Sequence, residues 1–150
     1  MPVKEMTVGE INQFLTCARV GRIGISTRNG PYVVPVGYVY AEDKIFFHTC
    51  SKGHKMDSMR QNRNVCFEVD ESLSDGSMFK SVILHGRVEV VEDKKRMLPY
   101  LQKLIDKYRV PLEFDQYMMK IGANREKELR AVRICMITPE KITGRQSFKG

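Results

Sequence analysis

The segment from Phe46 to Lys55 holds the side chains best suited to bind a ligand. It reads Phe-Phe-His-Thr-Cys-Ser-Lys-Gly-His-Lys, so a strand-like run ends in polar residues and a glycine precedes a predicted helix. The first turn of a helix offers unpaired backbone N–H groups and the positive end of the helix dipole, and both favour a phosphate. Gly53 allows close approach of the backbone, and hydroxyl and ammonium groups surround it at Thr49, Ser51, Lys52 and Lys55. A helix start that binds no ligand is the alternative interpretation of the same pattern.

Other kinds of chemistry find less support. His48, Cys50 and His54 are potential metal ligands, but the spacing H-x-C-x3-H matches no structural zinc pattern and a fourth ligand is not evident. We therefore predict that the chain binds no metal. The sequence also lacks a nucleophile elbow with Ser, His and Asp partners, so it gives no support to a hydrolase.

The composition is that of one globular domain spanning residues 1–150. Hydrophobic residues make up 42% and charged residues 29%, and no apolar stretch is long enough to cross a membrane. The N-terminus lacks a basic region followed by an apolar run, which predicts a cytoplasmic protein. The four cysteines are widely spaced and are expected to be free thiols.

The net charge of +7 favours anionic partners, either nucleic acid or a phosphate-bearing molecule. The basic residues are spread along the chain, however, and their densest groups alternate with acidic residues. This distribution indicates a solvated surface. We therefore expect a small-molecule ligand and no nucleic-acid or membrane partner.

Alternating apolar residues predict six strands, which cover residues 20–26, 32–40, 44–49, 65–69, 81–91 and 132–136. The first three are expected to form a meander, because turn signals stand at Asn29-Gly30 and Ala41-Glu42-Asp43. Pro35 cannot donate to a ladder, so its strand should be an edge strand or carry a bulge. Six strands with few helices between them indicate an antiparallel barrel in a mainly β (β plus α) fold.

Three helices are expected to flank this barrel. The first begins at a capping-box pattern formed by Thr7 and Glu10. The second follows Gly53 and ends at Asn62. The third follows Asp93, and Pro99 marks either a kink in it or its start.

Several segments, in order along the chain, resemble the pyridoxamine-phosphate-oxidase-like superfamily, and in particular its nitroimidazole-resistance branch. The matching segments are residues 33–38, 45–49, 53–56, 62–69, 81–91 and 142–145. The resemblance implies a six-stranded antiparallel split β-barrel with flanking helices. It further implies a homodimer that binds two FMN molecules at the subunit interface.

The resemblance also assigns flavin contacts to individual positions. Residues implied to line the isoalloxazine ring are Val34, Pro35 and Val36. Residues implied to lie along its edge are Phe47, His48 and Thr49. Those implied to hold the phosphate are Ser51, Lys52, Gly53 and Lys55. The residues implied to approach from the facing subunit are Ser81 and Arg145.

His48 is the candidate catalytic residue. The nitroimidazole-resistance branch carries a histidine beside the flavin, and His48 stands at the matching place. An imidazole can donate or accept a proton near neutral pH, so His48 could supply a polar contact or a proton next to the reduced flavin. A purely structural histidine is the alternative.

The resemblance therefore implies an FMN-dependent oxidoreductase. It would pass electrons from a reduced nicotinamide or another donor to a small organic acceptor such as a nitroaromatic. The Arg-x-His-type C-terminal signature of the true pyridoxamine phosphate oxidases is missing, so vitamin B6 oxidation is not predicted. The alternative is a non-enzymatic protein that stores or senses a flavin or, as some relatives with this barrel do through a histidine, a haem.

Overall fold

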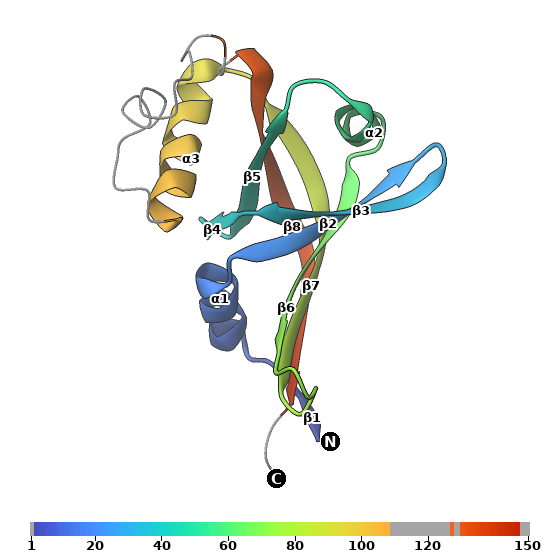
Figure 1. The fold of residues 1–150 in the computed structure, drawn as a ribbon, viewed down its shortest axis with the longest axis vertical. Coiled ribbons are helices and arrows are strands. Elements are labelled where there is room, and N and C mark those ends of the chain that lie inside the picture. The colour runs from blue at the N-terminus through green and yellow to red at the C-terminus, as the bar shows by residue number, and fades with distance from the viewer. Residues whose placement is uncertain (1, 109–126, 128–129, 148–150) are drawn as a thin grey trace.

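The computed structural model of the chain describes residues 2–108, 127 and 130–147 (Figure 1). The helices within these residues are α1 (Val8–Cys17), α2 (His54–Gln61) and α3 (Lys94–Lys107). The strands are β1 (Val3–Glu5), β2 (Val20–Thr27), β3 (Gly30–Gly37), β4 (Val39–Ala41), β5 (Lys44–Cys50), β6 (Asn64–Ser72), β7 (Phe79–Val91) and β8 (Val132–Ser147).

All these strands belong to one antiparallel sheet. Its order is β3-β2-β6-β7-β8-β5-β4, and β1 pairs with the end of β8. The order begins at β3 and ends at β4, so the sheet curls around a core without closing. This is a split β-barrel with flanking helices, as the sequence predicts.

The sheet has eight strands in the described part of the chain, rather than the predicted six. One addition is β1, whose three exposed residues are too few for an alternation to be recognised. The other arises because the run 32–40 divides at Tyr38 into β3 and β4. The N–H of Tyr38 donates to the hydroxyl of Tyr108 at 2.8 Å, which interrupts the strand.

The predicted meander of three consecutive strands is wrong. β3 pairs with β2 at one edge of the sheet, whereas β4 and β5 lie at the other edge, where β5 pairs with β8. Both turns stand where the sequence predicted them, and Gly30, Glu42 and Asp43 have φ angles of 110°, 55° and 60°. Local signals therefore located the turns, while the crossing between edges depends on distant contacts. Pro35 does lie on an edge strand, as predicted.

β8 continues well beyond its predicted end at residue 136, through Pro139 to Ser147. It pairs with β7 along its length, while its other edge pairs first with β5 and then with β1. The register with β7 shifts between His85 and Gly86. A Cβ atom on Gly86 would lie only 2.3 Å from the carbonyl oxygen of Thr138, so this crossing of backbones requires glycine.

The capping box at the start of α1 is confirmed. The hydroxyl of Thr7 accepts from the Glu10 N–H at 3.1 Å, and the Glu10 carboxylate accepts from the Thr7 N–H at 3.0 Å. Both bonds satisfy backbone donors that the first helical turn leaves free. The apolar face of α1 then buries Phe14 and Leu15 in the barrel.

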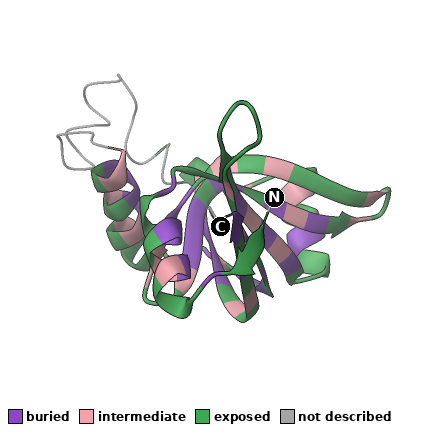
Figure 2. Cartoon of the chain, turned by 90° about the horizontal axis from the view of Figure 1, so that it is seen from below, coloured by how far each residue is buried: buried purple, intermediate pink, exposed green. Residues whose placement is uncertain are grey.

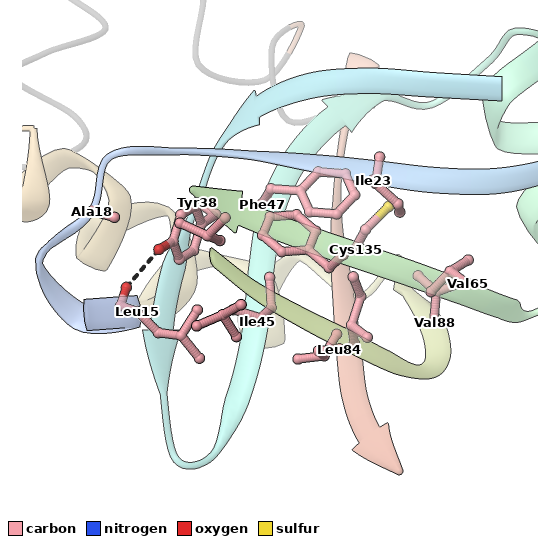
Figure 3. Close-up of a cluster of buried hydrophobic side chains, with 14 of the residues drawn as sticks. Leu15, Ala18, Ile23, Tyr38, Ile45, Phe47, Val65, Leu84, Val88 and Cys135 are labelled. Carbon is pink, nitrogen blue, oxygen red and sulfur yellow. Dashed lines mark hydrogen bonds between the residues drawn. The ribbon is translucent and has the colours of Figure 1, made fainter. Parts of the chain in front are cut away.

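The main core fills the barrel, and Figure 3 shows its centre. The Tyr38 hydroxyl donates to the Leu15 carbonyl at 2.6 Å, and the Tyr38 ring meets the ring of Phe67 edge-on at 5.2 Å. Buried and exposed residues alternate along the strands (Figure 2), as expected for a sheet with one face on a core. A second buried cluster, which includes Met97 and Leu101, packs α3 against the outside of β5 and β8.

Two residues at the C-terminal end of α3, Lys107 and Tyr108, contact the barrel and the segment before β2. The ammonium of Lys107 lies 4.0 Å from the centre of the Tyr38 ring and makes no hydrogen bond within the described residues. Loss of hydration and the neighbouring Arg19 lower the pKa of Lys107 to about 8. The Tyr108 hydroxyl donates to the Arg19 carbonyl at 2.5 Å.

Lys107→Met is expected to change how stability depends on pH. Between about pH 8 and the ordinary lysine pKa of 10.5, the unfolded chain keeps a proton that the folded chain has lost, so Lys107 makes the folded state more stable as pH rises. The variant lacks this contribution. Urea unfolding at several pH values should therefore show the free-energy difference, wild type minus variant, increasing across this window. An unchanging difference would contradict a lowered pKa.

Candidate functional site

The N-terminus of α2 leaves backbone donors unpaired. Its first residue follows Gly53, whose φ of 129° lies in the region that favours glycine. No side chain caps this end, and the first helical bond runs from the Asp57 N–H to the Gly53 carbonyl at 3.0 Å. The N–H groups before Asp57 therefore have no acceptor within the helix. They can bind an anion.

The polar residues predicted around this helix start lie in the same turn. Ser51 and Lys55 are half-buried, and Lys52 is exposed. The Ser51 N–H donates to the carbonyl of Ala131 at 2.8 Å, which ties the loop to the residue before β8. Asp57 also lies in the first turn and is exposed. The two lysines and the helix dipole give this end a positive balance.

β5 carries its predicted residues on both faces. Phe47 and Thr49 are buried on the face that lines the core, and Phe47 belongs to the same cluster as Met56 of α2. His48 points to the opposite face, where it stands beside Ile134 of β8 and is exposed. The structure thus separates His48 from its two neighbours in sequence.

Protein surroundings lower the pKa of His48 below its ordinary value of 6.5. The larger cause is partial loss of hydration, and the second is the positive charge of Lys55. Both effects favour the neutral imidazole, so the form of His48 that can donate a proton becomes populated at a more acidic pH than in a free histidine.

β3 presents mainly backbone to a ligand at the sheet edge. Val34 and Val36 pack against the core, while Pro35 is exposed on the outer face. Because β3 is an edge strand, half of its backbone polar groups point away from the β2 ladder. A flat ligand with donors and acceptors on its rim could pair with these groups.

Ser81 and Arg145 are brought together with each other, away from the phosphate-like site. They are direct partners in the β7–β8 ladder, so their side chains share the outer face of the sheet. They lie at the end of the long strands where β1 pairs, and α2 is at the opposite end of the molecule (Figure 1). Ladder pairings also place β3 and β7 three strand spacings apart, about 14 Å.

An ion cluster on the same outer face was not predicted. One guanidinium nitrogen of Arg22 lies 2.6 Å from Asp70 and 3.3 Å from Glu68. Burial and the neighbouring Asp70 raise the pKa of Glu68, and hydrogen bonds from Glu68 and Arg22 lower that of Asp70. Arg22 is the ladder partner of Pro35, and Asp70 that of Ser81. The sequence held no signal for this cluster, because it requires knowing that β2 pairs with β6.

The family model described as pyridoxamine 5'-phosphate oxidase matches residues 7–146. This chain belongs to that family. The match includes α1, β3, β5, α2 and nearly all of β8. None of the functionally curated proteins is significantly similar in sequence. No helix in the described part of the chain is long and apolar enough to cross a membrane.

The similar solved structures include two that are named as FAD-binding proteins. An FAD-binding protein from Mesorhizobium loti is 25% identical, with a TM-score of 0.74 and 99% of this chain and 100% of that one covered. A candidate 5-nitroimidazole antibiotic resistance protein from Bacteroides thetaiotaomicron is 21% identical, with a TM-score of 0.78 and coverage of 97% and 89%. An FAD- and haem-binding protein from Mycobacterium smegmatis is 15% identical, with a TM-score of 0.77 and coverage of 99% and 75%.

Proposed function

We propose that this member of the pyridoxamine 5'-phosphate oxidase family binds FMN and is an FMN-dependent oxidoreductase. The observation that carries the proposal is the uncapped N-terminus of α2, with Gly53 at positive φ and Lys55 in its first turn. Two of the similar structures are named as FAD-binding proteins, and these names support a flavin in particular.

The residues present fit the chemical parts of FMN. The free N–H groups of α2, with Ser51, Lys52 and Lys55, would hold the phosphate. The outward backbone groups of edge strand β3 would pair with the rim of the isoalloxazine ring. When bound, FMN would carry electrons between a donor and a small organic acceptor, for which we favour a nitroaromatic. The protein would hold the flavin in position and provide its polar and apolar surroundings.

The working form in this proposal is a homodimer. Ser81 and Arg145 lie together on the outer face, remote from the α2 N-terminus of their own chain. A second copy could present the same pair to the flavin held by its partner. Each of the two sites would then combine residues of both chains.

The visible absorption spectrum of the purified protein tests the proposal. Bound oxidised flavin absorbs at about 370 and 450 nm, and these bands should stay with a dimer-sized peak through gel filtration after FMN is added. A Soret band instead would favour the haem-binding alternative. Protein that stays colourless and does not retain added FMN would overturn the proposal.

His48→Gln tests the proton-donor role under acidic conditions. The imidazolium form of His48 becomes populated as pH falls through its lowered pKa, so wild-type turnover with a nitroaromatic should rise toward acid pH. The variant, compared at saturating FMN, should show a flat profile over the same range. NMR titration of the His48 ring gives its pKa independently of activity. A variant that keeps the wild-type acid rise would show that another group donates.

A further inference from the structure

A polar hollow lies at the C-terminal end of α2. It has a volume of about 540 Å³ and is bounded by the last turn of α2, the end of β7 and the start of α3. Arginine side chains line it from three segments: Arg60, Arg63 and Arg96. Its volume is within the range of small-molecule sites in proteins.

Two of these arginines are held in place by carboxylates. Arg60 is ion-paired with Glu92, and Arg96 lies 3.1 Å from Glu89. Each guanidinium carries five N–H donors, so most of them remain available after one such contact. The first pair joins α2 to Glu92, the residue after β7, and the second joins α3 to β7. They therefore restrain the rim of the hollow.

Of the three arginines that line the hollow, Arg63 has no carboxylate partner among the described residues. Its carbonyl accepts from the Val88 N–H at 2.9 Å, which fixes its backbone against β7. No hydrogen bond or ion pair of its side chain occurs within the described residues, and the residue is exposed. Arg63 lines the same hollow as the two paired arginines. Planar guanidinium groups suit a phosphate, which can take paired N–H bonds from several arginines.

The acidic residues of the hollow set the rest of the ligand's chemistry. Glu92 and Asp93 line the same space. One oxygen of Asp93 accepts from the Arg96 N–H at 3.0 Å as the cap of α3. Their remaining carboxylate oxygens can accept hydrogen bonds from hydroxyl groups. Arginines and carboxylates in one hollow therefore complement a molecule that carries both a phosphate and hydroxyls.

We propose that this hollow binds a phosphate monoester that carries sugar hydroxyls, such as a sugar phosphate or a ribonucleotide. The arginines contact the phosphate, and Glu92 and Asp93 contact the hydroxyls. This site is separate from the proposed flavin phosphate site, because the two lie at opposite ends of a helix about 12 Å long. It goes beyond the proposed function and does not depend on it.

Titration calorimetry with AMP, ribose 5-phosphate and inorganic phosphate tests the proposal. Both esters should bind to the wild-type protein more tightly than inorganic phosphate. Arg63→Ala should lower the affinity for both esters about tenfold or more. Arg63→Lys keeps the charge but loses the paired N–H donors of the guanidinium. Its affinity for the esters should therefore lie between that of the wild type and that of Arg63→Ala. Arg28→Ala, in the turn between β2 and β3, removes the same charge elsewhere and should bind as wild type.

A second pair of variants separates this site from the flavin site. Arg63→Ala should keep FMN affinity, and Lys55→Ala should keep ester affinity. Ester binding that is lost in Lys55→Ala would place the esters at the α2 N-terminus and overturn the proposal. It is likewise overturned if neither ester binds, if inorganic phosphate binds as tightly, or if folded Arg63→Ala binds as wild type.

Discussion

Replacing Lys55 with alanine is expected to weaken FMN binding by about 10- to 100-fold. Lys55 stands half-buried in the first turn of α2, beside the free N–H groups. A hydrogen bond between charged groups contributes about 1.5–3 kcal/mol, which gives this range. Fluorescence titration of apoprotein with FMN measures the dissociation constant, and the flavin-to-protein ratio after gel filtration gives a second reading.

The matched control is Lys103→Ala on the exposed side of α3. It removes the same charge from a helix that contributes nothing to the proposed site, so FMN affinity should change less than twofold. Both variants should unfold at the same urea concentration as wild type. If Lys55→Ala keeps the wild-type flavin ratio, the phosphate lies elsewhere.

Gly86→Ala is expected to be the most destabilising single-methyl change in the barrel. The new Cβ would lie 2.3 Å from the Thr138 carbonyl oxygen and 3.1 Å from the Pro139 Cα. Both neighbours are backbone atoms of β8, so relief requires the two longest strands to separate. We expect a loss of about 3 kcal/mol or more in the free energy of unfolding, at the upper end for overpacking. Urea denaturation followed by circular dichroism measures it.

Gly9→Ala is the control for that experiment. Gly9 lies in α1, and a Cβ there would meet no atom within 4 Å. Because alanine has a higher helix propensity than glycine, this change should leave the free energy of unfolding unchanged or raise it by up to about 1 kcal/mol. A loss below about 1 kcal/mol in Gly86→Ala would show that the register shift beside it can move to accept a side chain.

The sequence predicted the features that depend on neighbours along the chain. Thr7 and Glu10 are three residues apart and satisfy each other directly, so their capping box was visible in advance. The glycine before α2 was visible for the same reason. Tyr38 is a case that the sequence could not predict, because its contact is distant along the chain. Its N–H donates to Tyr108, seventy residues away, and this bond divides one predicted strand into two.

In the candidate site, too, the features set by neighbouring residues could be predicted and those set by distant contacts could not. The helix start near Lys55 could be predicted from composition and order, because all its parts lie within one turn. The faces of β5 could be predicted by alternation, which separates His48 from Phe47. The grouping of Arg22 with Asp70 could not, since it follows from the order of strands in the sheet.

The position of β8 has a consequence for how the protein is made. Among the strands that the structure describes, this one comes last in the sequence, yet it is the partner of β7, β5 and β1. While the chain leaves the ribosome, those three strands remain without their shared neighbour until residues 132–147 emerge. Folding dominated by such long-range pairing is slow and leaves strand edges open to other chains. Most of the barrel is therefore expected to form after synthesis, and newly made chains should depend on chaperones more than a helical protein of equal length.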